Sequence, residues 1–379
     1  MRRSNDHLRN LKRLAKTCFL IVPFLTLLSL TSIRELQAQV RRPQQPASGP
    51  GGAEGSFKVR QSTFGSSGKQ YWIFEPDPLR GSAPVIAFLH GWGATMPGGY
   101  KMWIEHIVQR GNIVIYPRYQ ENLREPPSNM VPNAIESIRE AISKLGNRAD
   151  RNKFALVGHS LGAIIVFNLA AERVALPTPK AVMSVEPGDT DANPALSGRV
   201  KLVREVEKYP QIPRNILALV VVGDEDRVAA DKAAKLQFSG IQQVPCENKN
   251  YIVVRSDRHG DPPLIANHFA PASGSRGGEE AAADARGGRL GGRRGGIIAR
   301  RRANQVQAEE RLVGEPAGSA DALDYYGYWK LFDGLTDSAF YGRNREYALG
   351  GGTKQTYMGT WSDGKPVQPL QVSNDPSCR

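Results

Sequence analysis

The chain has 379 residues, of which 40% are hydrophobic and 23% are charged. This composition is that of a folded globular protein, and it excludes a wholly disordered or fibrous one. The formal net charge is +13 at pH 7, but residues 1–42 carry nine basic and two acidic side chains, which is +7 of that excess. Because the charge is concentrated at one end, it is weak evidence for nucleic-acid binding, and we expect no nucleic-acid partner.

Residues 1–38 have the layout of a secretory signal peptide. A basic stretch reaches to Lys16, an apolar run follows from Cys18 to Leu30, and residues 36–38 offer a cleavage site. The apolar run is shorter than the roughly 20 residues that a membrane span needs. We therefore expect a secreted or periplasmic protein, with an uncleaved N-terminal membrane anchor as the alternative.

Residues 39–56 are rich in Pro, Gly, Gln and Ser, which is typical of a flexible linker before a domain that fills residues 57–379. Two cysteines remain after cleavage, Cys246 and Cys378. In an oxidising compartment they either pair as a disulfide or stay as free thiols, and the sequence alone leaves both open.

Eight segments of the domain have the pattern of β-strands. Residues 57–60 and 71–74 predict two short antiparallel strands around a Gly/Ser turn. Continuous apolar runs predict strands that are buried on both faces, at residues 85–89, 112–116, 154–157, 181–185, 216–222 and 251–254. Helical patterns separate them, at residues 99–110, 132–145, 201–208 and 229–238. This alternation predicts an α/β fold: a doubly wound, mostly parallel central sheet with helices on both faces.

Residues 271–315 interrupt the alternation. They contain three Arg-Gly-Gly triplets and an alanine-rich patch, and they lack the apolar residues that would fold them. Aromatic residues are not interleaved with the arginines, so we expect a disordered insertion rather than a nucleic-acid-binding segment. An aromatic-rich helix at residues 320–335 and a hairpin around Trp361 follow.

A G-x-S-x-G pentapeptide is the strongest functional signal in the chain. It is Gly158-His159-Ser160-Leu161-Gly162, between the predicted strand 154–157 and a helical run at 163–175. A serine hydroxyl is a poor nucleophile unless a turn exposes it beside a base and donors for an oxyanion. A strand–turn–helix of this kind is so tight that side chains flanking the serine would collide, which explains the two glycines. Ser160 is therefore the candidate nucleophile.

A second motif, His90-Gly91-Trp92-Gly93, follows the buried strand 85–89. With the pentapeptide it resembles the oxyanion turn and nucleophile elbow of the α/β-hydrolase superfamily, over roughly residues 57–270 and the last helix. The resemblance is closest to secreted serine esterases of the dienelactone-hydrolase, chlorophyllase and polyester-hydrolase type. It implies that the backbone amides of Trp92 and Leu161 stabilise the oxyanion.

The resemblance also implies an acid at the end of a strand beyond the nucleophile. The strand 216–222 is followed by Asp224 and Asp226, and Glu186 ends the strand before it. A glycine, two residues and then an aspartate is a spacing typical of the superfamily, so we prefer Asp226 as the acid. Asp224 and Glu186 are the alternatives.

The base is expected after one further strand. His259 lies five residues beyond the strand 251–254, and His268 lies farther along, in a loop or short helix. We prefer His259, because it follows the strand end and completes the superfamily's chain order of nucleophile, acid and base. His268 is the alternative base.

These residues together predict a secreted, lipase-like serine hydrolase that cleaves small or polymeric carboxylic esters through a Ser160–Asp226–His259 triad and an acyl-enzyme. A peptidase or acyltransferase that uses the same residues is one alternative. A non-catalytic binding module of the cell envelope, whose Arg/Gly-rich segment contacts anionic polymers, is another. No cofactor or metal is expected, because no His, Asp or Glu cluster has the spacing of metal ligands.

Overall fold

The computed structural model describes residues 39–53, 55, 57–188, 194–274 and 319–373. The predicted signal peptide at 1–38 lies outside the described residues, as does the predicted Arg/Gly-rich insertion from residue 275 onward. The chain divides into two compact units, residues 1–40 and 41–379. All of the described strands and helices belong to the second unit.

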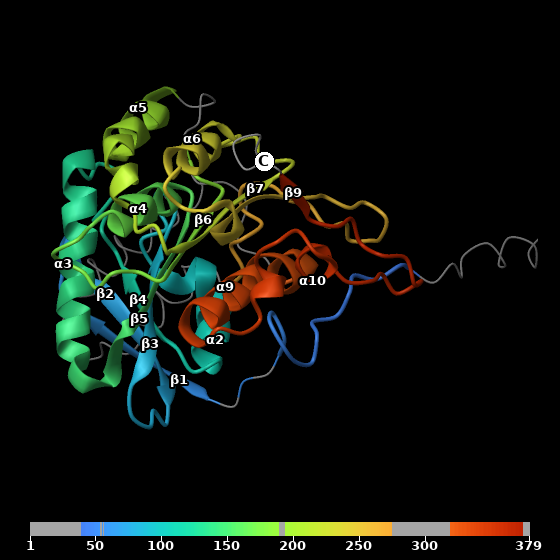
Figure 1. The fold of residues 1–379 in the computed structure, drawn as a ribbon, viewed down its shortest axis with the longest axis horizontal. Coiled ribbons are helices and arrows are strands. Elements are labelled where there is room, and N and C mark those ends of the chain that lie inside the picture. The colour runs from blue at the N-terminus through green and yellow to red at the C-terminus, as the bar shows by residue number, and fades with distance from the viewer. Residues whose placement is uncertain (1–38, 54, 56, 189–193, 275–318, 374–379) are drawn as a thin grey trace, which may run out of the picture. The chain divides into compact units, whose positions relative to one another are not determined.

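A nine-stranded sheet forms the centre of the second unit, as far as its residues are described (Figure 1). The strands are β1 (Lys58–Phe64), β2 (Tyr71–Asp77), β3 (Ala83–Leu89), β4 (Ile113–Pro117), β5 (Ala149–His159), β6 (Ala181–Val185), β7 (Leu217–Gly223), β8 (Lys249–Val254) and β9 (Gln371–Ser373). Their order across the sheet is β1-β2-β4-β3-β5-β6-β7-β8-β9. Neighbours from β4 to β8 run parallel, whereas β1, β2 and β9 join through antiparallel pairs. The predicted mostly parallel central sheet is confirmed.

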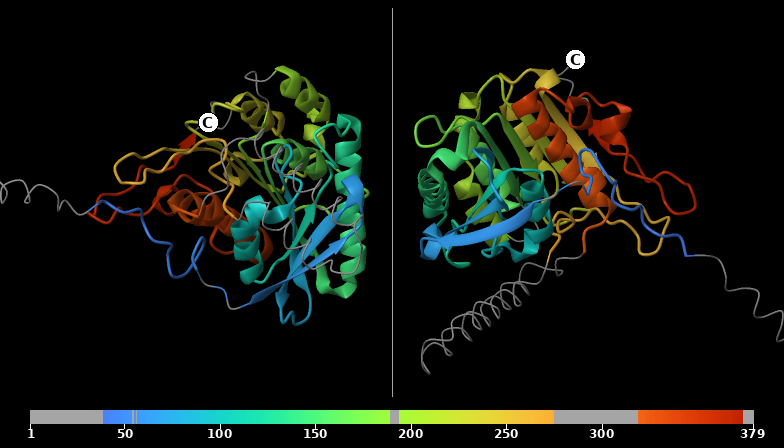
Figure 2. Two further views of the ribbon diagram at one scale, coloured as in Figure 1. Left: turned by 180° about the vertical axis from the view of Figure 1, so that it is seen from behind. Right: turned by 90° about the horizontal axis from the view of Figure 1, so that it is seen from below.

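Helices cover both faces of this sheet (Figure 1 and Figure 2). They are α2 (Lys101–Gln109), α3 (Pro127–Leu145), α4 (Leu161–Ala170), α5 (Pro194–Val203), α6 (Lys232–Gly240), α9 (Trp329–Tyr341) and α10 (Thr353–Thr356), with a π-helical turn at Leu323–Tyr328 before α9. The helices α3, α4 and α6 pack on one face, and α2 and α9 pack together on the other. The predicted doubly wound arrangement is therefore confirmed.

Burial explains why the parallel strands read as continuous apolar runs. Every residue of β3, β4 and β6 is buried, because helices cover both faces of the sheet. The edge strand β1 is exposed or half-buried along its whole length. Apolar side chains are therefore needed on both faces of the inner strands but not at this edge.

Two helices begin or end away from their predicted positions. Proline suits the first turn of a helix, and Pro132 therefore predicts a start there. The structure instead begins α3 at Pro127 and accommodates Pro132 inside it. The predicted helix at 201–208 is divided: α5 ends at Val203, and a 3-10 turn follows at Val206–Gln211.

Residues 41–53, which the composition assigns to a flexible linker, pack against α9 and the turn before it. The backbone amide of Gly51 donates to Asp333 Oδ2 at 2.7 Å, and Arg42 Nη1 forms a 2.8 Å ion pair with Asp321. A Cβ at position 51 would lie 1.8 Å from the backbone oxygen of Tyr325. The glycine that suggests a linker here instead permits close packing of two backbones.

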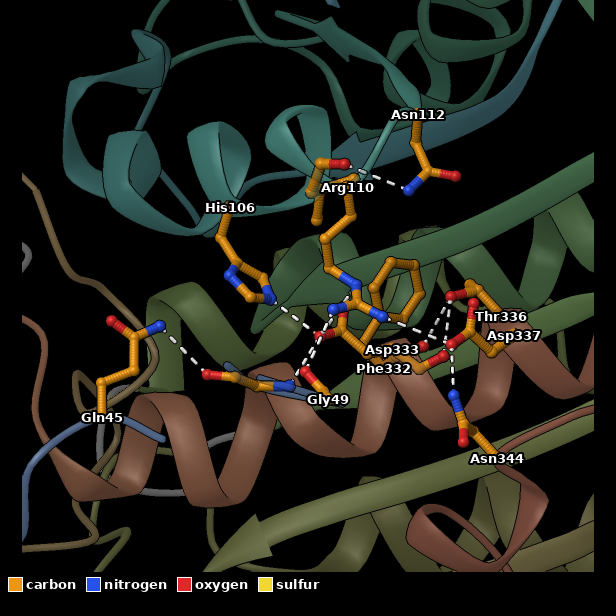
Figure 3. A network of polar contacts seen from close by, with 12 residues as sticks. Gln45, Gly49, His106, Arg110, Asn112, Phe332, Asp333, Thr336, Asp337 and Asn344 are labelled. Atoms are coloured by element: carbon orange, nitrogen blue, oxygen red, sulfur yellow. Dashed lines mark hydrogen bonds and ion pairs between the residues drawn. The ribbon is translucent and has the colours of Figure 1, made fainter. Parts of the chain in front are cut away.

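Asp333 is the centre of a buried polar network between α2, α9 and residues 41–53 (Figure 3). Its Oδ2 lies 2.8 Å from His106 Nε2 and 3.3 Å from Arg110 Nε. Burial alone would raise the pKa of Asp333, but the charges of His106 and Arg110 and the Gly51 amide lower it below its ordinary value. The carboxylate therefore stabilises the fold in its charged form.

Cys246 is disulfide-bonded in the structure. Cys378 lies outside the described residues, so the Cys246–Cys378 pairing stays a prediction. Within the described ranges, no helix has both the length and the apolar character that crossing a membrane requires.

We predict that Asp333→Asn lowers the free energy of unfolding by about 3 kcal/mol at neutral pH, because Arg110 loses a buried partner. The unfolded carboxyl titrates near pH ~4, so the stabilisation is complete above that pH and is lost as the pH falls through the lowered pKa of the folded state. Denaturant unfolding at neutral and at acidic pH measures both effects. The control Glu136→Gln removes an exposed ion pair with Lys69 and should leave stability nearly unchanged. An equal loss in both variants would contradict the prediction.

Candidate active site

Ser160 lies at a tight turn between β5 and α4. Its backbone has φ 55° and ψ −117°, a region that residues with a side chain rarely adopt. The flanking glycines permit the turn: a Cβ at Gly158 would lie 2.3 Å from the Gly162 oxygen, and a Cβ at Gly162 would lie 2.2 Å from the Leu89 oxygen. The Ser160 amide donates to the Val185 oxygen at 2.9 Å, which fixes the turn against the end of β6.

Ser160, His268 and Asp226 form one hydrogen-bonded chain. Ser160 Oγ lies 2.9 Å from His268 Nε2, and His268 Nδ1 lies 2.8 Å from Asp226 Oδ2. Since a carboxylate only accepts, Nδ1–H donates to Asp226, and Nε2 accepts the hydroxyl proton of Ser160. The exposed fractions of the three residues are 9%, 4% and 8%, so the chain is largely shielded from water. Chemically, this arrangement can serve as a nucleophile, a base and an acid that orients the base.

Asp226 is held by the loop that follows β7. Its Oδ1 accepts the backbone amides of Val228 and Ala229, both at 2.8 Å. Burial alone would raise the pKa of Asp226, but the hydrogen bond and charge of His268 and the Ala229 amide bring it below its ordinary value. Asp226 is therefore a carboxylate that can fix the tautomer of His268. The structure thus joins Asp226, the preferred acid, to Ser160 through His268.

The structure does not bring His259, the preferred base, to Ser160. His259 Nε2 lies 2.7 Å from Asp363 Oδ2, and its ring packs edge-on against Trp361. Its side chain is 28% exposed. The preference for His259 is therefore corrected in favour of the alternative base, His268.

The path of the chain after β8 explains this difference. Asp257 and Leu264 form an antiparallel bridge, which folds the residues between them into a small loop of their own. The Trp361 indole and the Gln368 amide hold this loop by donating to Asp257 Oδ2 at 3.1 Å and 2.9 Å. His259 lies in this loop, where its side chain is bonded to Asp363.

The chain then returns to the edge of the sheet, where His268 lies beside Ser160. The oxygen of Ala266 accepts the Glu225 amide at 3.1 Å, which joins the returning segment to the loop after β7. One sequence signal for this return is Gly223, where a Cβ would lie 2.2 Å from the Ala266 oxygen. The position of His268 therefore depends on contacts between separate loops rather than on distance from a strand end.

The two alternative acids have different environments. Asp224 Oδ1 accepts the amide and hydroxyl of Ser256, and its Oδ2 pairs with Arg255 Nε at 3.0 Å. Glu186 is fully buried, and burial, reinforced by the charge of the neighbouring Asp226, raises the pKa of its carboxyl well above the ordinary value. Burial therefore favours the neutral form of the Glu186 carboxyl, and Asp224 is bonded to Ser256 and Arg255.

Trp92 and Leu161, the predicted oxyanion donors, lie on the two turns beside Ser160. A Cβ at Gly91 would lie 3.2 Å from Ser160 Cβ, and Leu161 is the first residue of α4, where amides lack an acceptor within the helix. Gly188 marks the space next to the serine: a Cβ there would lie 2.9 Å from Ser160 Oγ and 3.5 Å from Leu161 N. The oxyanion roles of both amides stay predictions.

Tyr100 is a residue of the site that the sequence does not reveal. Its hydroxyl oxygen lies 3.0 Å from Gly91 N and 2.7 Å from His159 Nδ1. It ends the 3-10 turn Pro97–Tyr100 before α2, and no motif marks that position. A residue such as Tyr100 can be assigned to the site only from the folded structure, because it comes from a segment that is distant in sequence from Ser160.

We predict that Gly188→Ala slows the reaction of Ser160 with a fluorophosphonate by about tenfold or more, because the added methyl group fills the space beside Oγ. Gly99→Ala is the matched control, since nothing lies within 4 Å of a Cβ at that position. Labelling kinetics followed by intact mass measure both variants. Equal rates for wild type and Gly188→Ala would show that the reagent does not approach the serine through this space.

Comparisons with known proteins bear on this geometry. The chlorophyllase family model matches residues 53–194, which include the turn at Gly91 and the elbow at Ser160. Among solved structures, a mutant of the esterase rPPE is similar, with a TM-score of 0.43 and 16% identity, covering 57% of this chain and 76% of that one. No curated protein matches the sequence. The order of the sheet and the elbow at Ser160 are those of an α/β-hydrolase fold, and over residues 53–194 the chain is similar to the chlorophyllase family.

Proposed function

We propose that this protein is a serine hydrolase of carboxylic esters, with Ser160 as nucleophile, His268 as general base and Asp226 as the acid that orients the base. The observation that most supports this is the unbroken chain of hydrogen bonds, 2.9 Å from Ser160 to His268 and 2.8 Å from His268 to Asp226. The chlorophyllase match over residues 53–194 supports an ester as the substrate class.

In the first half of the reaction, Ser160 Oγ attacks the ester carbonyl carbon while its proton moves to His268 Nε2. The carbonyl oxygen becomes an oxyanion, to which the backbone amides of Trp92 and Leu161 donate. His268 then gives the proton to the leaving alcohol oxygen, the bond between the carbonyl carbon and that oxygen breaks, and the acyl group remains on Ser160.

In the second half, water attacks the acyl carbon while His268 accepts one of its protons. The second tetrahedral intermediate collapses as His268 returns that proton to Ser160 Oγ, and a carboxylic acid leaves. Each cycle consumes one ester and one water and yields one acid and one alcohol. Throughout, Asp226 keeps Nδ1 of His268 as a donor and stabilises the imidazolium with its negative charge.

Ser160→Ala and His268→Ala should each lower kcat for a p-nitrophenyl ester by about a thousandfold or more, because they remove the nucleophile and the base. Asp226→Asn should have an effect of the same order, since an amide no longer fixes Nδ1 as a donor. His259→Ala is the matched control, a histidine from the neighbouring loop that is bonded to Asp363 instead of Ser160, and should keep kcat within about threefold of wild type. Hydrolysis at saturating ester, with a melting curve for each variant, measures these effects.

Two outcomes distinguish a wrong assignment of the base from a wrong proposed function. Loss of activity in His259→Ala, with His268→Ala still active, would overturn the assignment of the base. An active Ser160→Ala variant would overturn the proposed function itself.

A further inference from the structure

His159 lies beside Ser160 in the pentapeptide, and the proposed reaction gives it no role. It is 3% exposed, and both of its ring nitrogens are engaged. Nδ1 lies 2.7 Å from the Tyr100 hydroxyl oxygen, and Nε2 lies 2.7 Å from the backbone oxygen of His268. His159 thus contacts the main chain of the residue that carries the proposed base.

Tyr100 extends this contact to the oxyanion turn. Its hydroxyl oxygen lies 3.0 Å from Gly91 N. Gly91 immediately precedes Trp92, whose amide is a proposed oxyanion donor. One line of hydrogen bonds therefore joins the turn at Gly91, the elbow at His159 and the loop at His268.

The direction of each bond follows from which groups can donate. The backbone oxygen of His268 only accepts, so His159 Nε2 carries a proton. A neutral imidazole then has a bare Nδ1, which accepts the hydroxyl proton of Tyr100. The tyrosine oxygen is left to accept the Gly91 amide, and every group in the line has a partner of the right kind.

The surroundings keep the line in this neutral form. Burial, together with the charge of the neighbouring His268, lowers the pKa of His159 to about 3. Burial also raises the pKa of Tyr100, so its hydroxyl keeps its proton. At neutral pH the donors and acceptors of the line are therefore fixed.

We propose that His159 is a positioning residue: it holds the backbone of His268 relative to Ser160 and, through Tyr100, relative to the turn that carries Trp92. This inference rests on the proposed function, because it concerns the same site. The imidazole of His268 must stay within hydrogen-bond reach of Ser160 Oγ, and a displacement of about 1 Å can cost up to about a hundredfold in rate. The chain reaches His268 only after a separate loop, so the bond from His159 to the backbone oxygen of His268 limits that displacement directly from the elbow.

Substitutions of His159 separate its two bonds. His159→Gln keeps a donor near the position of Nε2 that can reach the His268 oxygen, so kcat should stay within about threefold of wild type. His159→Asn keeps an acceptor near Nδ1 but is too short to reach His268, so kcat should fall by about tenfold or more with KM changed less than about twofold. His159→Phe lacks both bonds and should fall at least as far.

Tyr100→Phe removes the middle link and keeps the ring. It should also lower kcat by about tenfold, and its combination with His159→Asn should cost less than the two separate effects together, because both act on one line of hydrogen bonds. His259→Asn is the matched control: His259 lies in the loop just before His268 but is bonded to Asp363 at 2.7 Å, and the variant should behave as wild type.

A near-native kcat in folded His159→Asn, or a His159→Gln variant as impaired as His159→Phe, would overturn the proposal. If His159→Asn fails to fold, Tyr100→Phe decides: a loss of about tenfold with unchanged melting supports the proposal, and a native kcat overturns it. Ser160→Ala in the same assay separates the two claims. Activity in Ser160→Ala removes the proposed function and this inference with it, whereas an inactive Ser160→Ala beside an unaffected His159→Asn removes the inference alone.

Discussion

The close approach of the main chain at the elbow is the constraint on which the rest of the site depends. Gly162 packs directly against the end of β3, where a Cβ would lie 2.2 Å from the Leu89 oxygen and 2.5 Å from the His90 oxygen. This contact sets the turn after β3 beside the serine after β5. Because parallel strands present their carboxyl ends at one edge, the loops after β6 and β7 meet the same point. The Ser160 amide, bonded to the Val185 oxygen at 2.9 Å, fastens the turn to β6.

The electrostatics of this edge depend on two neighbouring carboxyls whose pKa values are shifted in opposite directions. Burial would raise the pKa of Asp226, yet His268 lowers it, whereas the pKa of Glu186 is raised by burial first and by the Asp226 charge second. Glu186 Oε2 accepts the Gly223 amide at 2.9 Å, and the Tyr328 hydroxyl donates to Glu186 Oε1 at 3.3 Å. These opposite shifts favour a single negative charge, on Asp226, whose Oδ2 lies 2.8 Å from His268 Nδ1. Two charged carboxylates here would repel each other in a buried site.

Local patterns predict the regular part of the fold and the elbow, because their causes lie within a few residues. The apolar runs follow from strands covered on both faces, and Gly158 reports a contact with Gly162 inside one turn. The position of His268, the proposed base, depends instead on long-range contacts: the bridge at Asp257 and the Trp361 indole hold the loop of His259, and the chain returns at His268. Residues 41–53 are a similar case, since their packing is set by α9, hundreds of positions away in sequence.

A crystal structure of the protein after reaction with a fluorophosphonate tests the central claim most directly. The account predicts phosphorus bonded to Ser160 Oγ, with its phosphoryl oxygen facing the amides of Trp92 and Leu161 and His268 Nε2 within hydrogen-bond distance of the adduct. Phosphorus on another residue, or His259 in place of His268 beside the adduct, would contradict it.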